Sequence, residues 1–275
     1  MKNIIFHNDQ WLENNAIFNV DDRALRGDGV FDTMLIIKEE STKPYFAHAD
    51  LHFDRLKNNA HHMEIPLKKN HDELLNIAQQ LCDKNNLKAG RYALKTTLTR
   101  GMSNHGLMPP SNEETQETLT MHLTATSEAF PDINAIIARR YKRNEYSPLS
   151  QIKSMNYGDN ILSLIEARHK GANEALIQNI HGHIVCASAG NIFVVIDNQL
   201  YTPPLSDGVL DGITRKLLIR KYHVIESSLT FDDVTNKAQG IFITNSIKGC
   251  RPVRVLNGKA LNEPEIKIDP DFHLD

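Results

Sequence analysis

The sequence predicts an α+β, or mixed α/β, protein of two domains. Apolar, β-branched runs typical of strands outnumber helical repeats, and the two kinds do not alternate strictly. The pattern lapses between residues 127 and 132, where Pro131 interrupts it. A chain of 275 residues suffices for one large domain or two smaller ones. We therefore predict an N-terminal α/β domain over residues 1–126, a linker over 127–132, and a C-terminal mixed α/β domain over 133–275.

The elements of the N-terminal domain follow from periodicity. Short apolar pieces at residues 4–6 and 16–18 favour strands, and Asn8-Asp9 favours a turn between them. Apolar residues at helical spacing predict helices, the second with a clear apolar stripe. The predicted helices cover residues 48–62 and 72–85, and the further strands cover 30–37, 91–99 and 118–125.

The C-terminal domain is read in the same way. A loop at residues 146–152 precedes its first helix, and the polar stretch after residue 262 predicts no further helix. The predicted helices cover 156–169 and 212–221, and the strands cover 135–139, 174–178, 183–186, 191–196, 240–243 and 251–256.

Composition excludes several classes of function. The formal net charge is −3, and the one basic cluster, residues 139–143, is typical of a solvated strand end rather than a nucleic-acid footprint. No apolar run approaches the roughly 18 residues of a membrane span, and the N-terminus lacks a secretory pattern. Cys82, Cys186 and Cys250 are too few and too scattered for a disulfide framework, so we predict a cytoplasmic protein. His181 and His183 lack a third ligand at recognisable spacing, which argues against a metal site.

Three features together fit an anionic cofactor held beside an amine. Lys153 follows Ile152 and precedes a predicted helix, and a lysine in partly apolar surroundings can act as a nucleophile. Gly212 and Thr214 open a second helix, whose free amides and hydroxyl can hold a phosphate. Arg55 can add a forked, charge-assisted contact. Each feature alone has an ordinary alternative, a solvated lysine or a simple helix cap.

Read in order, the motifs resemble those of the fold-type IV enzymes that depend on pyridoxal 5'-phosphate (PLP). This family includes branched-chain and D-amino-acid aminotransferases and 4-amino-4-deoxychorismate lyase. The resemblance covers nearly the whole chain and implies the two-domain architecture of the D-amino-acid aminotransferases. The matching segments are Arg26-Gly27-Asp28-Gly29-Val30-Phe31-Asp32-Thr33, His52-Phe53-Asp54-Arg55-Leu56, Thr99-Arg100-Gly101, Lys153-Ser154-Met155-Asn156-Tyr157, residues 187–193, Gly212-Ile213-Thr214-Arg215, Thr244-Asn245-Ser246 and Pro252-Val253.

The resemblance implies a role for each matching residue. Lys153 would bind the cofactor as a Schiff base and carry protons, as the catalytic residue. Tyr157 and Phe31 would line the pocket, and the chain would form a homodimer. The phosphate would be held by Arg55, Gly212, Ile213, Thr214, Asn245 and Ser246.

Two positions at which the chain departs from the family pattern bear on which branch of the family it resembles most. Residues 94–101 look most like the lyase branch, where Arg100 and a later arginine would bind a substrate carboxylate, but His105 stands at the later position. Cys186 stands where the family has the glutamate that contacts the pyridine nitrogen, and a thiol is a far weaker partner for a protonated ring.

The thiol at Cys186 favours a lyase that converts aminodeoxychorismate to 4-aminobenzoate and pyruvate, because aromatisation drives that reaction. Two alternatives stay open: an aminotransferase acting on branched-chain or D-amino acids, and a non-catalytic relative that binds PLP. In each enzymatic reading the partner is a small amine carrying a carboxylate.

Overall fold

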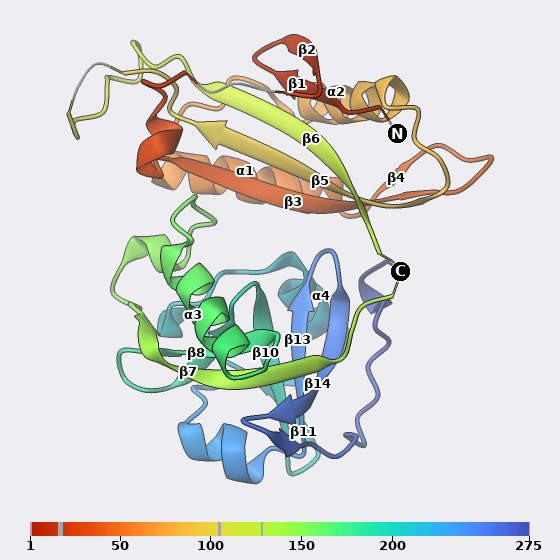
Figure 1. Ribbon diagram of the computed structural model, residues 1–275, viewed down its shortest axis with the longest axis vertical. Coiled ribbons are helices and arrows are strands. Elements are labelled where there is room, and N and C mark those ends of the chain that lie inside the picture. The colour runs from red at the N-terminus through yellow and green to blue at the C-terminus, as the bar shows by residue number, and fades with distance from the viewer. Residues whose placement is uncertain (1, 16–18, 104–105, 128, 275) are drawn as a thin grey trace. The chain divides into compact units, whose positions relative to one another are not determined.

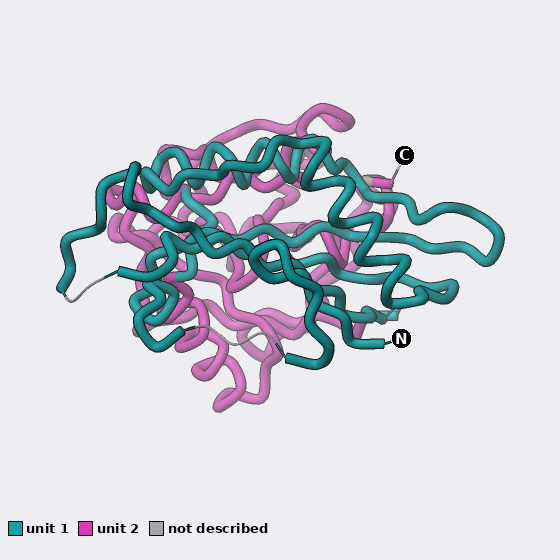
Figure 2. Tube along the Cα trace, turned by 90° about the horizontal axis from the view of Figure 1, so that it is seen from above, with its two compact units in different colours: residues 1–129, 152–155 teal, residues 130–151, 156–275 magenta. Residues whose placement is uncertain are grey.

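The computed structural model describes residues 2–15, 19–103, 106–127 and 129–274. It consists of two compact units (Figure 2). Unit 1 comprises Met1–Ala129 together with Ile152–Met155, and unit 2 comprises Phe130–Gln151 together with Asn156–Asp275. The sequence predicts Lys153 in the C-terminal domain, whereas its segment packs as part of unit 1. The physical reason is main-chain pairing of this segment with a strand of unit 1, which a division by sequence range does not capture.

The described part of unit 1 contains an antiparallel sheet of six strands in the order β2-β1-β6-β5-β3-β4 (Figure 1). The turn between β1 and β2 places Asn8 and Asp9 at positive φ, a conformation that Asn and Asp tolerate. The strands are β1 Ile4–His7, β2 Gln10–Glu13, β3 Gly29–Lys38, β4 Tyr45–Phe46, β5 Gly90–Thr99 and β6 Thr118–Thr126.

Two helices, α1 (Ala49–His62) and α2 (His71–Lys84), pack on the apolar face of this sheet. A capping box begins α2: the Asn70 side chain accepts from the Glu73 amide at 3.0 Å, and the Glu73 carboxylate accepts from the Asn70 amide at 2.8 Å. The core includes Leu56, Leu74 and Leu81, each fully buried, and burial of such a side chain contributes about 1.5–3 kcal/mol.

The described part of unit 2 is built on a nine-stranded mixed sheet. Its path runs β10-β13-β14-β7-β8-β9, and β9 pairs again with β10, so this part of the sheet closes on itself. Alternate residues of β10 serve different cores: Ile192 and Val194 join the cluster shared by these strands, and Phe193 and Val195 pack with Leu218 of α4. The strands are β7 Ile133–Arg143, β8 Glu174–Asn179, β9 Ile184–Ala187, β10 Gly190–Ile196, β11 Gln199–Thr202, β12 Val224–Glu226, β13 Gly240–Asn245, β14 Gly249–Leu256 and β15 Lys259–Ala260.

Two α-helices accompany this sheet, α3 (Gly158–His169) and α4 (Ile213–Lys221). Helix α3 packs on β7 and β8 through Ala167, which meets Ile136 and Ala175 in a small cluster. None of the helices among the described residues is long and apolar enough to cross a membrane.

The predicted fold class is confirmed, and the long predicted helices and strands match observed elements to within a few residues. Strands β2, β4, β11, β12 and β15 are short and were not predicted. The predicted strand at residues 16–18 lies outside the described residues. Strand β7 extends through the basic cluster to Arg143, whose side chain turns inward to donate to the carbonyls of Gly208 and Ser150, so this residue is not part of a solvated strand end.

Candidate functional site

The backbone around Lys153 is fastened to the beginning of β3. The Phe31 amide donates to the Lys153 carbonyl at 3.0 Å, and the Met155 amide donates to the Gly29 carbonyl at 2.9 Å. A Cβ on Gly29 would lie 2.9 Å from the Leu98 carbonyl oxygen, a backbone atom that cannot move aside as the nearby Met155 side chain can, so this position requires glycine. The half-buried ammonium of Lys153 lies 4.3 Å from the centre of the Phe31 ring. Lys153 and Phe31, predicted as site residues, are therefore in contact.

Arg55, on α1, is held in a fixed orientation by Asp32 of β3. The carboxylate accepts from Arg55 Nε at 2.8 Å and Nη2 at 2.9 Å, a forked pair, and from His52 Nδ1 at 2.6 Å. Burial by itself would raise the pKa of Asp32, but the charges and hydrogen bonds of Arg55 and His52 outweigh it and hold that pKa far below its usual range. Burial lowers the pKa of His52, so a neutral ring donates its Nδ1–H to the carboxylate.

The start of α4 in unit 2 leaves buried polar atoms without partners. Gly212 is the N-cap residue and provides no side-chain cap, and the hydroxyl of Thr214, itself 2 % exposed, has no hydrogen-bond partner among the described residues. The buried hydroxyl of Thr244, at the end of β13, has none either within the described part of the chain. A helix start with an orphaned, buried hydroxyl fits a bound anion such as a phosphate.

Asn191 of β10 connects the parts of unit 2 that the sequence assigned to the cofactor. Its Nδ2 donates to the Leu210 carbonyl at 2.8 Å, and its Oδ1 occupies the space that a Cβ on Gly212 would need. In the sheet it is paired with Cys186 on one side and with Thr244 on the other. The loop before α4, the Cys186 strand and the end of β13 therefore meet around one amide.

The predicted turn at Asn245 and Ser246 adjoins this group. Asn245 Oδ1 accepts from the amide of Lys248 at 2.8 Å, which fixes the turn, and its Nδ2 donates to the Ala189 carbonyl at 3.2 Å. Ser246 is half-buried in the same turn, and Ile213 is buried in the first turn of α4. Tyr157, half-buried, is the N-cap residue of α3.

Cys186 is a buried thiol on β9. Burial raises the pKa of this thiol, and the neighbouring Arg143 guanidinium offsets the effect only in part. Because Arg143 also donates to two main-chain carbonyls, its charge is shared with other acceptors. The group at this position is a neutral thiol at physiological pH, which can take part in hydrogen bonds but carries no charge.

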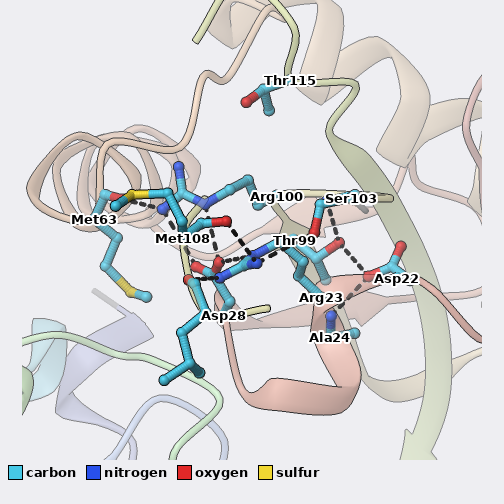
Figure 3. Close-up of polar contacts among 12 residues, drawn as sticks. Asp22, Arg23, Ala24, Asp28, Met63, Thr99, Arg100, Ser103, Met108 and Thr115 are labelled. Atoms are coloured by element: carbon cyan, nitrogen blue, oxygen red, sulfur yellow. Dashed lines mark hydrogen bonds and ion pairs between the residues drawn. The ribbon is translucent and has the colours of Figure 1, made fainter. Parts of the chain in front are cut away.

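Arg100 lies in a cluster that the sequence did not predict (Figure 3). Its side chain is bound to Asp28 at 2.9 and 3.3 Å and to the carbonyls of Met63 and Glu64 at 2.6 and 2.7 Å, so four of its five N–H groups are engaged. Arg23 binds the same carboxylate and donates to the Leu107 carbonyl at 2.9 Å. Burial would raise the pKa of Asp28, but the two arginines lower it. Arg100 is thus fastened to the end of α1, and its contact with a substrate carboxylate stays a prediction; His105 lies outside the described residues.

Sequence reasoning missed Asp32, His52, Asn191, Thr244 and Arg143 as parts of the site. Asp32 had a readable signal, since a carboxylate interrupts the apolar run of β3 on the face that meets α1, where His52 and Arg55 stand three residues apart. Asn191 and Thr244 had no such signal, because their roles depend on which strands pair. Among the described residues there is also no cluster of three or more His, Cys, Asp or Glu side chains placed to hold a metal ion.

Comparisons with known proteins identify the family of this chain. The family model for class IV aminotransferases matches residues 29–256, so the chain belongs to the class IV aminotransferases, a family of PLP-dependent enzymes. The predicted family, fold, cofactor and enzyme class are thereby confirmed.

Individual relatives point to different reactions. A "putative branched-chain-amino-acid aminotransferase" of Methanocaldococcus jannaschii is 28% identical, covering 92% of this chain and 88% of the relative. A D-alanine aminotransferase of Staphylococcus haemolyticus is 25% identical, covering 96% of this chain and 89% of the relative. A crystal structure of a "putative 4-amino-4-deoxychorismate lyase" from Legionella pneumophila is 31% identical, covers 90% of each chain and has a TM-score of 0.82.

The crowding at Gly212 leads to a testable expectation. In Gly212→Ala the new Cβ would displace the Asn191 amide, and overpacking of this kind costs about 1–3 kcal/mol. We expect the affinity for PLP, measured by absorption titration, to fall by about tenfold or more. Gly158→Ala is the matched control, because a Cβ there meets nothing within 4 Å. An affinity of Gly212→Ala equal to that of the control would show that this loop does not shape the cofactor site.

Proposed function

We propose that this chain is a PLP-dependent lyase that converts 4-amino-4-deoxychorismate to 4-aminobenzoate and pyruvate. The observation that carries the proposal is the buried, neutral thiol of Cys186, which stands where the resemblance places a charged carboxylate. The likeness to the Legionella structure described as such a lyase supports it.

The residues present fit the cofactor. In unit 2, the orphaned hydroxyl of Thr214, the first amides of α4 and the Asn245 turn offer hydrogen bonds to a phosphate. In unit 1, Arg55 carries a positive charge that Asp32 holds in one orientation. Cys186 would face the pyridine nitrogen, and Lys153 would supply the amine that binds the carbonyl. When bound, PLP supplies an electron sink for the bonds around the substrate amine.

Within this site Lys153 is the proton carrier. Its amine takes the proton from the ring carbon that bears the substrate's amino group, the bond between the ring and the enolpyruvyl oxygen breaks, and the ring becomes aromatic. The departing enol takes up a proton to become pyruvate. The Lys153 nitrogen lies over the face of the Phe31 ring, and this contact positions the group that moves the proton.

Cys186 explains why lysis is favoured over transamination. Transamination depends on a deep electron sink, and therefore on a protonated pyridine nitrogen, which a carboxylate stabilises and a neutral thiol does not. The gain from aromatisation reduces this need in the lyase reaction. The specific alternative is an aminotransferase, which the names of the Methanocaldococcus and Staphylococcus relatives favour.

A direct assay separates the two reactions. The purified holoenzyme is given aminodeoxychorismate in one experiment, and D-alanine or a branched-chain amino acid with 2-oxoglutarate in another. We expect 4-aminobenzoate and pyruvate from the first and little glutamate from the second. Glutamate formation without 4-aminobenzoate would overturn the lyase proposal. We further propose that the protein is cytoplasmic and forms a homodimer. Sedimentation of the holoenzyme tests the homodimer.

The Cys186 argument predicts the effect of restoring the carboxylate. We expect Cys186→Glu to raise transaminase activity by about tenfold, or about 1.4 kcal/mol of barrier, because Arg143 can balance the new charge and the carboxylate deepens the sink. Cys186→Ser, which stays neutral, is the control. If Cys186→Glu folds normally by circular dichroism and transaminates no faster than Cys186→Ser, the thiol is not the cause of a preference for lysis.

A further inference from the structure

The turn that connects β13 to β14 is fixed at Lys248 by both main-chain groups of this residue. The Lys248 amide donates to Asn245 Oδ1 at 2.8 Å, and the Lys248 carbonyl accepts from Nε of Arg251 at 2.8 Å. The pairing of Asn245 with Gly249 closes the turn between these two contacts. The conformation of the turn that the proposed function assigns to the phosphate therefore depends on where the Arg251 side chain lies.

An aromatic ring from the predicted linker lies beside this turn. Phe130 falls within the predicted linker at residues 127–132, and its half-buried side chain belongs to unit 2, as the turn does. The centre of the ring is 5.3 Å from Cζ of Arg251 and 5.8 Å from Nζ of Lys248. Both distances are within the roughly 6 Å over which a cation is attracted to the face of an aromatic ring. The ring therefore connects the linker to the two cations of the turn.

The Phe130 ring is the group that balances these two cations. Among the residues that the structure describes, neither Arg251 nor Lys248 has a carboxylate within ion-pair distance, whereas Arg254 of the same strand lies 3.6 Å from Glu263. Two positive charges beside each other repel, and the negative face of an aromatic ring offsets that repulsion. Phe130 therefore holds the Arg251 side chain next to the turn.

We propose that Arg251 and Phe130 are positioning residues for the cofactor, which hold the Asn245 turn in the conformation that accepts the phosphate of PLP. This inference rests on the part of the proposed function that assigns the phosphate to this turn, and it is independent of the reaction catalysed. A turn that already has its bound conformation loses less conformational entropy when the phosphate binds, so a fixed turn raises the affinity for the cofactor.

The affinity for PLP, compared with that for pyridoxal, tests this role because pyridoxal lacks the phosphate. Phe130→Leu keeps an apolar side chain and removes the ring face, whereas Phe130→Tyr keeps the face. Absorption titration of apoenzyme prepared from the holoenzyme should show an affinity for PLP about fivefold lower in Phe130→Leu and restored in Phe130→Tyr. The affinity for pyridoxal should stay unchanged. Equal weakening of PLP and pyridoxal would indicate a merely structural role and would overturn the proposal.

A second pair of variants separates positioning from charge. Arg251→Met removes the contact with the ring and the hydrogen bond to the turn, and we expect it to lower the affinity for PLP by about tenfold. Arg254→Met is the matched control, because it removes the same charge from the same strand at a residue whose ion pairs are with Asp132 and Glu263. Equal losses in the two variants would mean that charge alone attracts the cofactor. A loss in Arg251→Met without one in Phe130→Leu would mean that Arg251 binds the phosphate itself. Either result would contradict the proposed role.

Hydrogen exchange provides a readout that needs no ligand and no activity. The Lys248 amide is protected by its bond to Asn245, so it reports on the order of the turn. In the apoenzyme, the peptide that contains residues 245–249 should exchange faster in Phe130→Leu than in wild type or in Phe130→Tyr. Equal exchange in all three proteins would show that the ring does not fix the turn.

Asn245→Ala separates the failure of this inference from the failure of the phosphate assignment. If Asn245→Ala weakens PLP but not pyridoxal, and Phe130→Leu weakens neither, the turn holds the phosphate without help from the linker. If Asn245→Ala leaves the preference for PLP over pyridoxal unchanged, the turn is not the phosphate site and the inference fails with that assignment. Neither measurement uses aminodeoxychorismate, so the loss of the lyase proposal would leave this test intact.

Discussion

Replacing Lys153 with alanine is expected to remove the visible absorption band of the lysine-bound cofactor and to lower the rate of 4-aminobenzoate formation by about 10³-fold or more. The variant loses both the amine that binds the cofactor and the base that moves the proton, and a positioned general base alone contributes about 10²–10⁴-fold. The fold should survive, because the contacts that fasten this segment to β3 are made by main-chain atoms.

Chemical reduction locates the bond independently of rate. Treatment of the wild-type holoenzyme with borohydride should add the mass of the reduced cofactor to the peptide that contains Lys153. Lys88→Ala, at an exposed position, should keep both the band and the activity. Addition of the cofactor mass to another lysine, or activity of Lys153→Ala within about tenfold of wild type, would mean that another group carries the chemistry.

The sequence predicts the helices and long strands of this fold well because each makes its own periodic signal. Helix α2 combines a capping box at Asn70 with an apolar stripe, β3 is a long and mostly apolar run, and β5 is rich in threonine, which favours strands. Strands β4 and β15 are two residues long and exist only because a neighbouring strand offers hydrogen bonds. Such elements have no local signal to read.

Some residues of the candidate site can likewise be read from the sequence, and others cannot. The resemblance names Lys153, Arg55 and the start of α4, because these residues stand in recognisable motifs. It does not reveal that Arg100 is held by Asp28 and the end of α1, since Met63 and Glu64 act through their carbonyls and any residue type supplies those.

Asp32→Asn is expected to lower the free energy of unfolding of unit 1 by about 3–5 kcal/mol, because it removes the buried negative charge that the Arg55 guanidinium and the His52 ring both bind. Trp11 packs on Phe6 within unit 1 and is the only tryptophan of the chain, so its fluorescence during urea unfolding reports on this unit. Asp54→Asn is the control: Asp54 also pairs with a histidine, His71, at 3.2 Å, but at an exposed site where such pairs contribute about 1 kcal/mol or less.

The pH dependence of this effect has a definite sign. The pKa of Asp32 in the folded chain lies below its unfolded value of about 4, so the unfolded chain binds more protons. The stability contributed by Asp32 is therefore complete above about pH 4 and is lost progressively as the pH falls below that value toward the folded pKa. The difference between wild type and Asp32→Asn should be largest near neutral pH and should shrink in acid. A difference no larger than that of Asp54→Asn, or one that grows in acid, would show that the carboxylate does not hold Arg55 as an ion pair.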